Sequence, residues 1–200
     1  MNVRPKWRLL AEAGHAGDES TVRANLADSD PVARELALGA LARMEAITEP
    51  DLLVAFADPV AAVRRRAGQL AARFPTVNLI PVLADTDPAV VEMAAWAAGE
   101  HEIVPDPVLQ VLCRLAGTAE DALVREAAVA ALGAIGDERG LPAILVGCSD
   151  RPAIRRRAVL ALAPFSGPAV DAALQAALAD RDWQVRQAAE DIAAFMFDEP

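Results

Sequence analysis

Residues 124–133 read VREAAVAALG, and five other ten-residue stretches of the chain resemble this one. They are ARELALGALA from Ala33, VRRRAGQLAA from Val63, VEMAAWAAGE from Val91, IRRRAVLALA from Ile154 and VRQAAEDIAA from Val185. Successive starts lie 28 to 33 residues apart. A repeat of this length is typical of chains built from stacked supersecondary units.

Three columns of this alignment carry physical meaning. The first is aliphatic or small in every copy, and the second is arginine in all copies but one. The second column reads Arg34, Arg64, Glu92, Arg125, Arg155 and Arg186. The fifth is always alanine: Ala37, Ala67, Ala95, Ala128, Ala158 and Ala189. Columns one and five share a helical face. An alanine there lets a neighbouring helix pack closely.

A shorter apolar run precedes each copy, and acidic, proline-bearing turns such as DSDP and DTDP separate the two. Aspartate is a preferred N-cap and proline suits the first helical turn. Asp30, Asp58, Asp87 and Asp150 are therefore expected to mark the start of a second helix. Pro81 lies further inside its run, and we expect it to kink or restart that helix.

The sequence thus predicts an all-α fold, a right-handed α-solenoid (α-α superhelix) of about six helical hairpins. Its low aromatic content, 4%, and its wealth of alanine and leucine agree with this. We expect one domain over residues 1–200, with the second helices lining a concave face. Residues 1–18 form an N-terminal cap, and the predicted repeats are 19–47, 48–75, 76–101, 105–136, 138–165 and 167–197.

The pattern D-P-x-V-R-x-x-A-x-x-A-L resembles the HEAT-like repeats of the phycobilisome-lyase type, which have an armadillo-like fold. ALGAIGDERGLPAIL at residues 131–145 is similar to that family's linking phrase, and the resemblance spans residues 19–197. The family includes scaffolds, chaperone-like lyase subunits and a few enzymes. The resemblance also implies that the second-column arginines pair with turn aspartates or carbonyls in a ladder between repeats. Asp28, Asp58 and Asp180, six residues before their arginines, suit that role.

The net charge and the search for targeting segments limit the classes of partner that we expect. The formal net charge of −10 disfavours binding to nucleic-acid phosphates. Neither a signal-peptide pattern nor a membrane-spanning run is found in the sequence, which predicts a cytoplasmic protein without a membrane partner. Cys113 and Cys148 lie in apolar runs and are expected to be small buried residues.

The sequence offers only weak candidates for catalytic or metal-binding residues. His15 and His101 are far apart in sequence, and no nucleophile–histidine spacing accompanies them. His101-Glu102 resembles one His-Glu motif of deoxyhypusine hydroxylase, a HEAT-like iron enzyme, but that enzyme uses four. Carboxylate pairs such as Asp28/Asp30 are better explained as helix caps. We therefore predict no enzyme activity, no cofactor and no metal.

The tryptophans and the C-terminal aromatics are assigned packing roles. Trp96 aligns with Leu38, Val129 and Val159, which predicts packing, although HEAT-like alkylpurine glycosylases use aromatic and basic side chains on DNA. Trp183 is expected to cover a helix end and Trp7 to cap the first repeat. Phe195, Met196 and Phe197 have no following repeat, so they could fold back or mediate self-association.

The third and fourth columns vary too much to form a ladder and are expected near the inner face of the stack. The predicted partner contacts are Arg65, Arg66, Met93, Glu126, Arg156 and Arg157. The predicted function is a non-catalytic protein–protein interaction scaffold or adaptor, because a rigid groove loses little entropy on binding. The alternatives are an accessory, chaperone-like subunit of an enzyme and, with less support from the charge, a nucleic-acid-binding HEAT-like protein.

Overall fold

The computed structural model describes residues 6–197, with the side chains of residues 7–194. The described part of the chain is helical and has no strand, which confirms the predicted all-α class. Helix α1 (Lys6–Ala16) precedes six helical hairpins. The first, or A, helices are α2 (Glu19–Ala24), α4 (Glu49–Phe56), α6 (Ile80–Leu83), α8 (Asp106–Thr118), α10 (Leu141–Gly147) and α12 (Pro168–Leu178). The second, or B, helices are α3 (Pro31–Arg43), α5 (Ala61–Leu70), α7 (Pro88–Gly99), α9 (Ala122–Ile135), α11 (Pro152–Ala161) and α13 (Trp183–Phe197).

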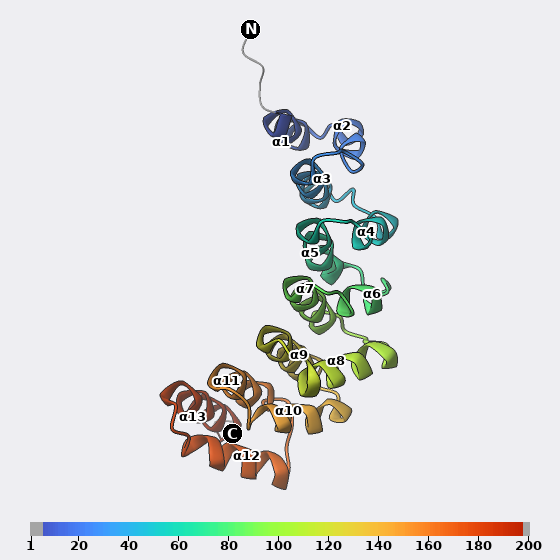
Figure 1. Cartoon of the computed structure of the whole chain (residues 1–200). Helices are drawn as coiled ribbons and strands as arrows, with labels where there is room; N and C mark the ends of the chain where they lie inside the picture. The colour runs from blue at the N-terminus through green and yellow to red at the C-terminus, as the bar shows by residue number, and fades with distance from the viewer. Residues whose placement is uncertain (1–5, 198–200) are drawn as a thin grey trace. The chain divides into compact units, whose positions relative to one another are not determined.

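The helices form two compact units, residues 1–94 and residues 95–200. In the first unit, α1, α3 and α5 stack in one row, and α2 and α4 lie beside them in a second row (Figure 1). In the second unit, α9, α11 and α13 stack in one row beside α8, α10 and α12 (Figure 1). Each unit is thus a stack of antiparallel hairpins, the predicted α-solenoid architecture.

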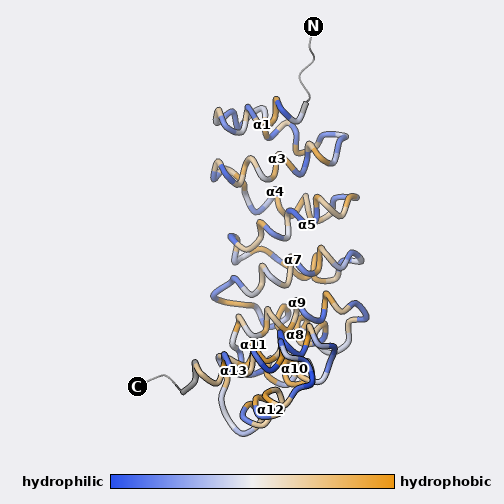
Figure 2. Tube along the Cα trace, turned by 90° about the vertical axis from the view of Figure 1, so that its left-hand side faces the viewer, coloured by the Kyte–Doolittle hydropathy of each residue, from blue (hydrophilic) through white to orange (hydrophobic). Residues whose placement is uncertain are grey.

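The fifth-column alanines are fully buried. Every one of them is 0% exposed: Ala37, Ala67, Ala95, Ala128, Ala158 and Ala189. The first-column residues four positions earlier are buried too, so this helical face carries the contact between layers. A few hydrophilic residues interrupt otherwise apolar or small residues along α3, α5 and α9 (Figure 2).

Two aspartates in each of these turns make different hydrogen bonds. In Asp28-Ser29-Asp30 and Asp180-Arg181-Asp182, the second aspartate caps the B helix: the Oδ1 atoms of Asp30 and Asp182 accept from the Val32 and Gln184 amides at 3.0 and 2.9 Å. The first aspartate instead accepts the amide of the second, at 2.8 Å in both turns. The first aspartate therefore does not cap the B helix.

Two of the expected helix starts were wrong in detail. Asp58 lies outside the helix cap, because α5 begins at Ala61 and the Asp58 carboxylate accepts the amide of Val60. At α11 the residue in the cap position is Arg151, and the Asp150 carboxylate accepts the Arg151 amide. Pro81 lies in the first turn of the short helix α6, which agrees with the expected restart.

The first repeat is covered by α1. This helix packs on α3, and the Trp7 indole Nε1 donates to Asp30 Oδ2 at 2.8 Å, which supports the predicted capping role of Trp7. Phe195, Met196 and Phe197 lie in α13, but their side chains fall outside the described residues. None of the described helices combines the length and apolar character needed to cross a bilayer.

Candidate interaction surface

Four of the second-column arginines form a ladder between successive hairpins. Each guanidinium binds both carboxylate oxygens of an aspartate that lies 21 to 25 residues later, in the next hairpin. The pairs are Arg34–Asp58, Arg64–Asp85, Arg125–Asp150 and Arg155–Asp180, with Nε–Oδ2 distances of 2.6 to 2.8 Å. The third donor, Nη1, bonds a backbone carbonyl at the arginine's own turn, such as Asp58 O for Arg64 at 2.8 Å. The ladder role suggested by the resemblance is therefore observed.

The carboxylates of the ladder are held in their charged form. Hydrogen bonds from Arg64, Arg125 and Arg155 are the main cause that lowers the pKa of Asp85, Asp150 and Asp180, respectively. Partial burial opposes this shift, but the arginine bond and a backbone amide outweigh it. The Nε, Nη1 and Nη2 atoms of these three arginines each donate a hydrogen bond within the chain.

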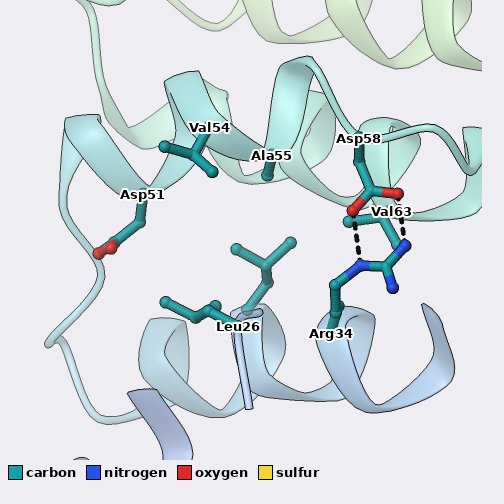
Figure 3. Close-up of a pocket in the computed structure, with 8 residues that line it drawn as sticks. Leu26, Arg34, Asp51, Val54, Ala55, Asp58 and Val63 are labelled. Atoms are coloured by element: carbon teal, nitrogen blue, oxygen red, sulfur yellow. Dashed lines mark hydrogen bonds and ion pairs between the residues drawn. The ribbon is translucent and has the colours of Figure 1, made fainter. Parts of the chain in front are cut away.

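Leu26, Val54, Ala55 and Val63 surround the first ladder pair in a small pocket, which Figure 3 shows with the Arg34–Asp58 bonds dashed. Its volume is about 100 Å³. Sites for drug-sized ligands usually enclose several hundred cubic ångströms, so this pocket is too small for such a molecule. Arg34 and Asp58 bind each other, and Asp51, which also lines the pocket, binds Arg23, so we assign the pocket a structural role.

The ladder ends at Arg186. Its Nη1 keeps the bond to the Asp180 carbonyl at 2.7 Å, but no carboxylate binds it among the described residues. In the sixth column of the repeat, Leu38, Val129 and Val159 are buried, whereas Glu190 is exposed.

The third column lies at the surface in every repeat, and we name its six side chains the third-column surface: Glu35, Arg65, Met93, Glu126, Arg156 and Gln187. None of them is buried. The ladder arginines bind the turns of the neighbouring hairpin, whereas the adjacent third-column side chains are at least partly exposed to solvent.

Three of the predicted contacts come together in the first unit. Arg65 and Arg66 of α5 and Met93 of α7 line one groove with Glu35, Gln69 and Glu92, and its volume is about 310 Å³. We call it the Arg65 groove. The Arg66 Nη1 donates to Gln69 Oε1 at 2.6 Å, whereas Arg65 is exposed and no hydrogen bond or ion pair holds its side chain within the described chain. The groove carries charges of both signs.

The other three predicted contacts lie in the second unit, in two places. Arg157 approaches Glu126 of α9, with 3.7 Å between Arg157 Nε and Glu126 Oε1, a weak and partly exposed ion pair. Arg156 of α11 instead lines a groove of about 180 Å³ with Leu160, Trp183, Gln184, Gln187, Ala188 and Asp191. We call this the Arg156 groove. Trp183 was not among the predicted contacts, and its exposure could not be read from the sequence.

The predicted packing of Trp96 is wrong. Its column-mates Leu38, Val129 and Val159 are buried, but the indole of Trp96 is 43% exposed. The indole is far larger than a valine side chain, so the site that encloses Val129 does not enclose it. Trp183 does not bury itself against the helix end either, because it is 64% exposed.

The next residues to place are the His-Glu pair and the two cysteines. His101 is buried while Glu102 is exposed, and no three His, Cys, Asp or Glu side chains converge as a metal site anywhere in residues 6–197. Cys113 and Cys148 are free and half-buried rather than fully buried. Burial raises the pKa of Cys148 to about 11, which keeps this thiol protonated and unreactive at neutral pH.

Helical hairpins stacked through a buried alanine column and an Arg–Asp ladder define the class of α-solenoid repeat proteins. Residues 76–150 match the family model of HEAT repeats. This match supports the HEAT-like repeat family that the repeat pattern predicted.

Solved structures agree on the fold. An engineered protein from the Northeast Structural Genomics Consortium is 21% identical, with a TM-score of 0.58 over 88% of this chain and 97% of its own. YibA of Escherichia coli is 17% identical, with a TM-score of 0.55 over 100% of this chain and 66% of its own. Human deoxyhypusine hydroxylase is 17% identical over 100% of this chain and 92% of its own, but its TM-score of 0.45 is too low to bear on activity. A search of curated protein sequences found no match.

Proposed function

We propose that the protein is a non-catalytic interaction scaffold that binds a protein partner through its third-column surface. HEAT repeats commonly serve as protein-interaction scaffolds, so the fold supports this class of function. The observation that carries the proposal is a difference between neighbouring arginines. Arg64 and Arg155 are committed to the ladder, while Arg65 and Arg156, one residue later, are exposed and unpaired within the described chain.

Arginine at such a position favours a binding role. An exposed guanidinium offers five donors in a planar arrangement that matches carboxylates, and arginine is enriched at energetically important interface positions. The grooves that hold Arg65 and Arg156 each include side chains from successive B helices. A partner bound there would contact rigid helices, so little conformational entropy would be lost.

Affinity capture from cells that naturally contain the protein tests this proposal. The wild type is compared with Arg65→Glu and Arg156→Glu, and with Arg114→Glu as the matched control. Arg114 is exposed on α8 and unpaired among the described residues, so this control makes the same charge change outside both grooves. Loss of a specific partner in either groove variant, but not in the control, is the expected result.

An identical partner set in all four proteins would refute the proposal. Capture of an enzyme as the specific partner would make the protein an accessory subunit, whereas capture of DNA or RNA would replace the proposal with nucleic-acid binding. The cytoplasmic location also stays a prediction, which cell fractionation tests.

A further inference from the structure

Trp183 is unusual for its position in the repeat. It is the first residue of α13, and it is 64% exposed. The equivalent residues of the other repeats are proline or alanine: Pro31, Ala61, Ala89, Ala122 and Pro152. Neither helix initiation nor burial therefore explains an indole here. An exposed indole offers a partner a large apolar face and one hydrogen-bond donor.

Two residues of α11 line the same groove as Trp183. Arg156 and Leu160, four residues apart on one face of α11, line the Arg156 groove opposite Trp183 of α13. Leu160 is only half-buried, so it adds apolar surface to that of the indole. Tryptophan and arginine are the residues most enriched among those that dominate binding energy at interfaces.

Arg156 is the basic side chain that lines this groove, and it favours an acidic ligand group. Asp191, the acidic side chain of the same lining, accepts a hydrogen bond from Gln187 Nε2 at 3.0 Å. The carboxylate of Asp182 beside it caps α13 through the Gln184 amide. Arg156 has no such bond within the described residues, so its donors are open to a carboxylate, which a guanidinium can bind with two parallel bonds.

We propose that the Arg156 groove binds a partner segment in which an aspartate or glutamate stands next to a large apolar side chain. This inference rests on the proposed scaffold function and specifies the partner at one of its two grooves. The carboxylate pairs with Arg156, and the apolar side chain packs on Trp183 and Leu160. The groove volume of about 180 Å³ suits one large side chain rather than a whole folded surface.

Three fluorescent peptides of equal length test the chemistry. Each is a short Gly/Ser peptide with a central Leu-Asp-Phe-Asp, Leu-Lys-Phe-Lys or Leu-Asn-Phe-Asn segment, and binding to the full chain is followed by fluorescence polarisation at physiological ionic strength. The acidic peptide is expected to bind best to the wild type. Arg156→Glu and Trp183→Ala should each weaken it by about tenfold or more, as expected for central interface residues. Arg156→Glu should also favour the lysine peptide, and the control Arg114→Glu should change neither.

The opposite results overturn the inference. It fails if the lysine or asparagine peptide binds the wild type as well as the acidic one, if no peptide binds, or if binding ignores both substitutions. Circular dichroism and thermal unfolding of each variant show whether a lost signal reflects unfolding. If partner capture depends on Arg65 or Arg156 while the acidic peptide fails, the scaffold function stands and only the ligand chemistry is wrong. If the peptide binds as expected but the captured partners never change, the failure lies with the scaffold function.

Discussion

Gly133 of α9 lies directly against Ala161 of α11. A methyl group placed on Gly133 would come within 2.5 Å of the Ala161 Cβ and 2.6 Å of its Cα. These atoms belong to a buried residue and to its backbone, so they cannot rotate away as the end of a flexible side chain could. The two helices can approach this closely because Gly133 has no side chain.

Gly133→Ala should therefore destabilise the second unit. Although alanine is the better helix former, overpacking a tight contact costs about 1–3 kcal/mol, and this contact is tight enough to reach the upper part of that range. Urea unfolding followed by circular dichroism measures the change. Gly117→Ala is the matched control: nothing lies within 4 Å of the added methyl group, so it should stabilise α8 by up to about 1 kcal/mol. Equal effects of the two substitutions would contradict the packing described here.

The ladder predicts a coupling between Arg155 and Asp180. Their two hydrogen bonds, 2.8 and 2.7 Å long, lie between hairpins and are largely shielded from solvent. Arg155→Ala and Asp180→Ala should each lower the unfolding free energy by about 1.5–3 kcal/mol, because each leaves a charged partner without its bonds. The double variant should lose less than the sum, and a double-mutant cycle measures the difference. Strict additivity would show that the pair contributes nothing jointly.

Acid should weaken the ladder. Hydrogen bonds from Arg64, Arg125 and Arg155 lower the pKa of Asp85, Asp150 and Asp180 below the ordinary value of 3.8. A carboxylate with a lowered pKa in the folded state adds stability that is present above the unfolded-state pKa and is lost as the pH falls through the folded-state pKa. The contribution of these three carboxylates to the unfolding free energy should therefore be constant near neutrality and should decrease below about pH 4.

Asp180→Asn isolates one of these contributions. It should lower stability at neutral pH and make the decline in acid shallower, because the Arg155–Asp180 ion pair is no longer present to be lost. Urea titrations at a series of pH values provide the measurement. A wild type that became more stable on acidification would show that the sign is wrong.

The thiols should react slowly in the folded protein. Burial raises the pKa of Cys148 to about 11 and also raises that of Cys113. Only the thiolate is nucleophilic, and at pH 8 roughly one Cys148 in a thousand would be ionised. Labelling with Ellman's reagent should thus be much faster in urea than in buffer, and rapid labelling of both native thiols would contradict the burial seen here.

The repeat pattern predicted the local architecture correctly, for a physical reason. Spacing within one helix is fixed by helix geometry, so an alanine four residues after an aliphatic residue must share its face, and Ala128 and Ala158 are indeed fully buried. The capping of α3 by Asp30 is also a local interaction, since it joins residues two apart. Such features depend on neighbours in the sequence alone.

Contacts between hairpins were decided by the tertiary structure. Asp180 lies six residues before Arg186, but its carboxylate binds Arg155 of the preceding hairpin and offers Arg186 only its backbone carbonyl. The exposure of Trp96 and the groove that Arg156 and Trp183 both line likewise depend on how one B helix lies against the next. A helical period determines which side chains share a face, but the offset and distance between stacked helices determine which of those faces pack together and which stay exposed to solvent.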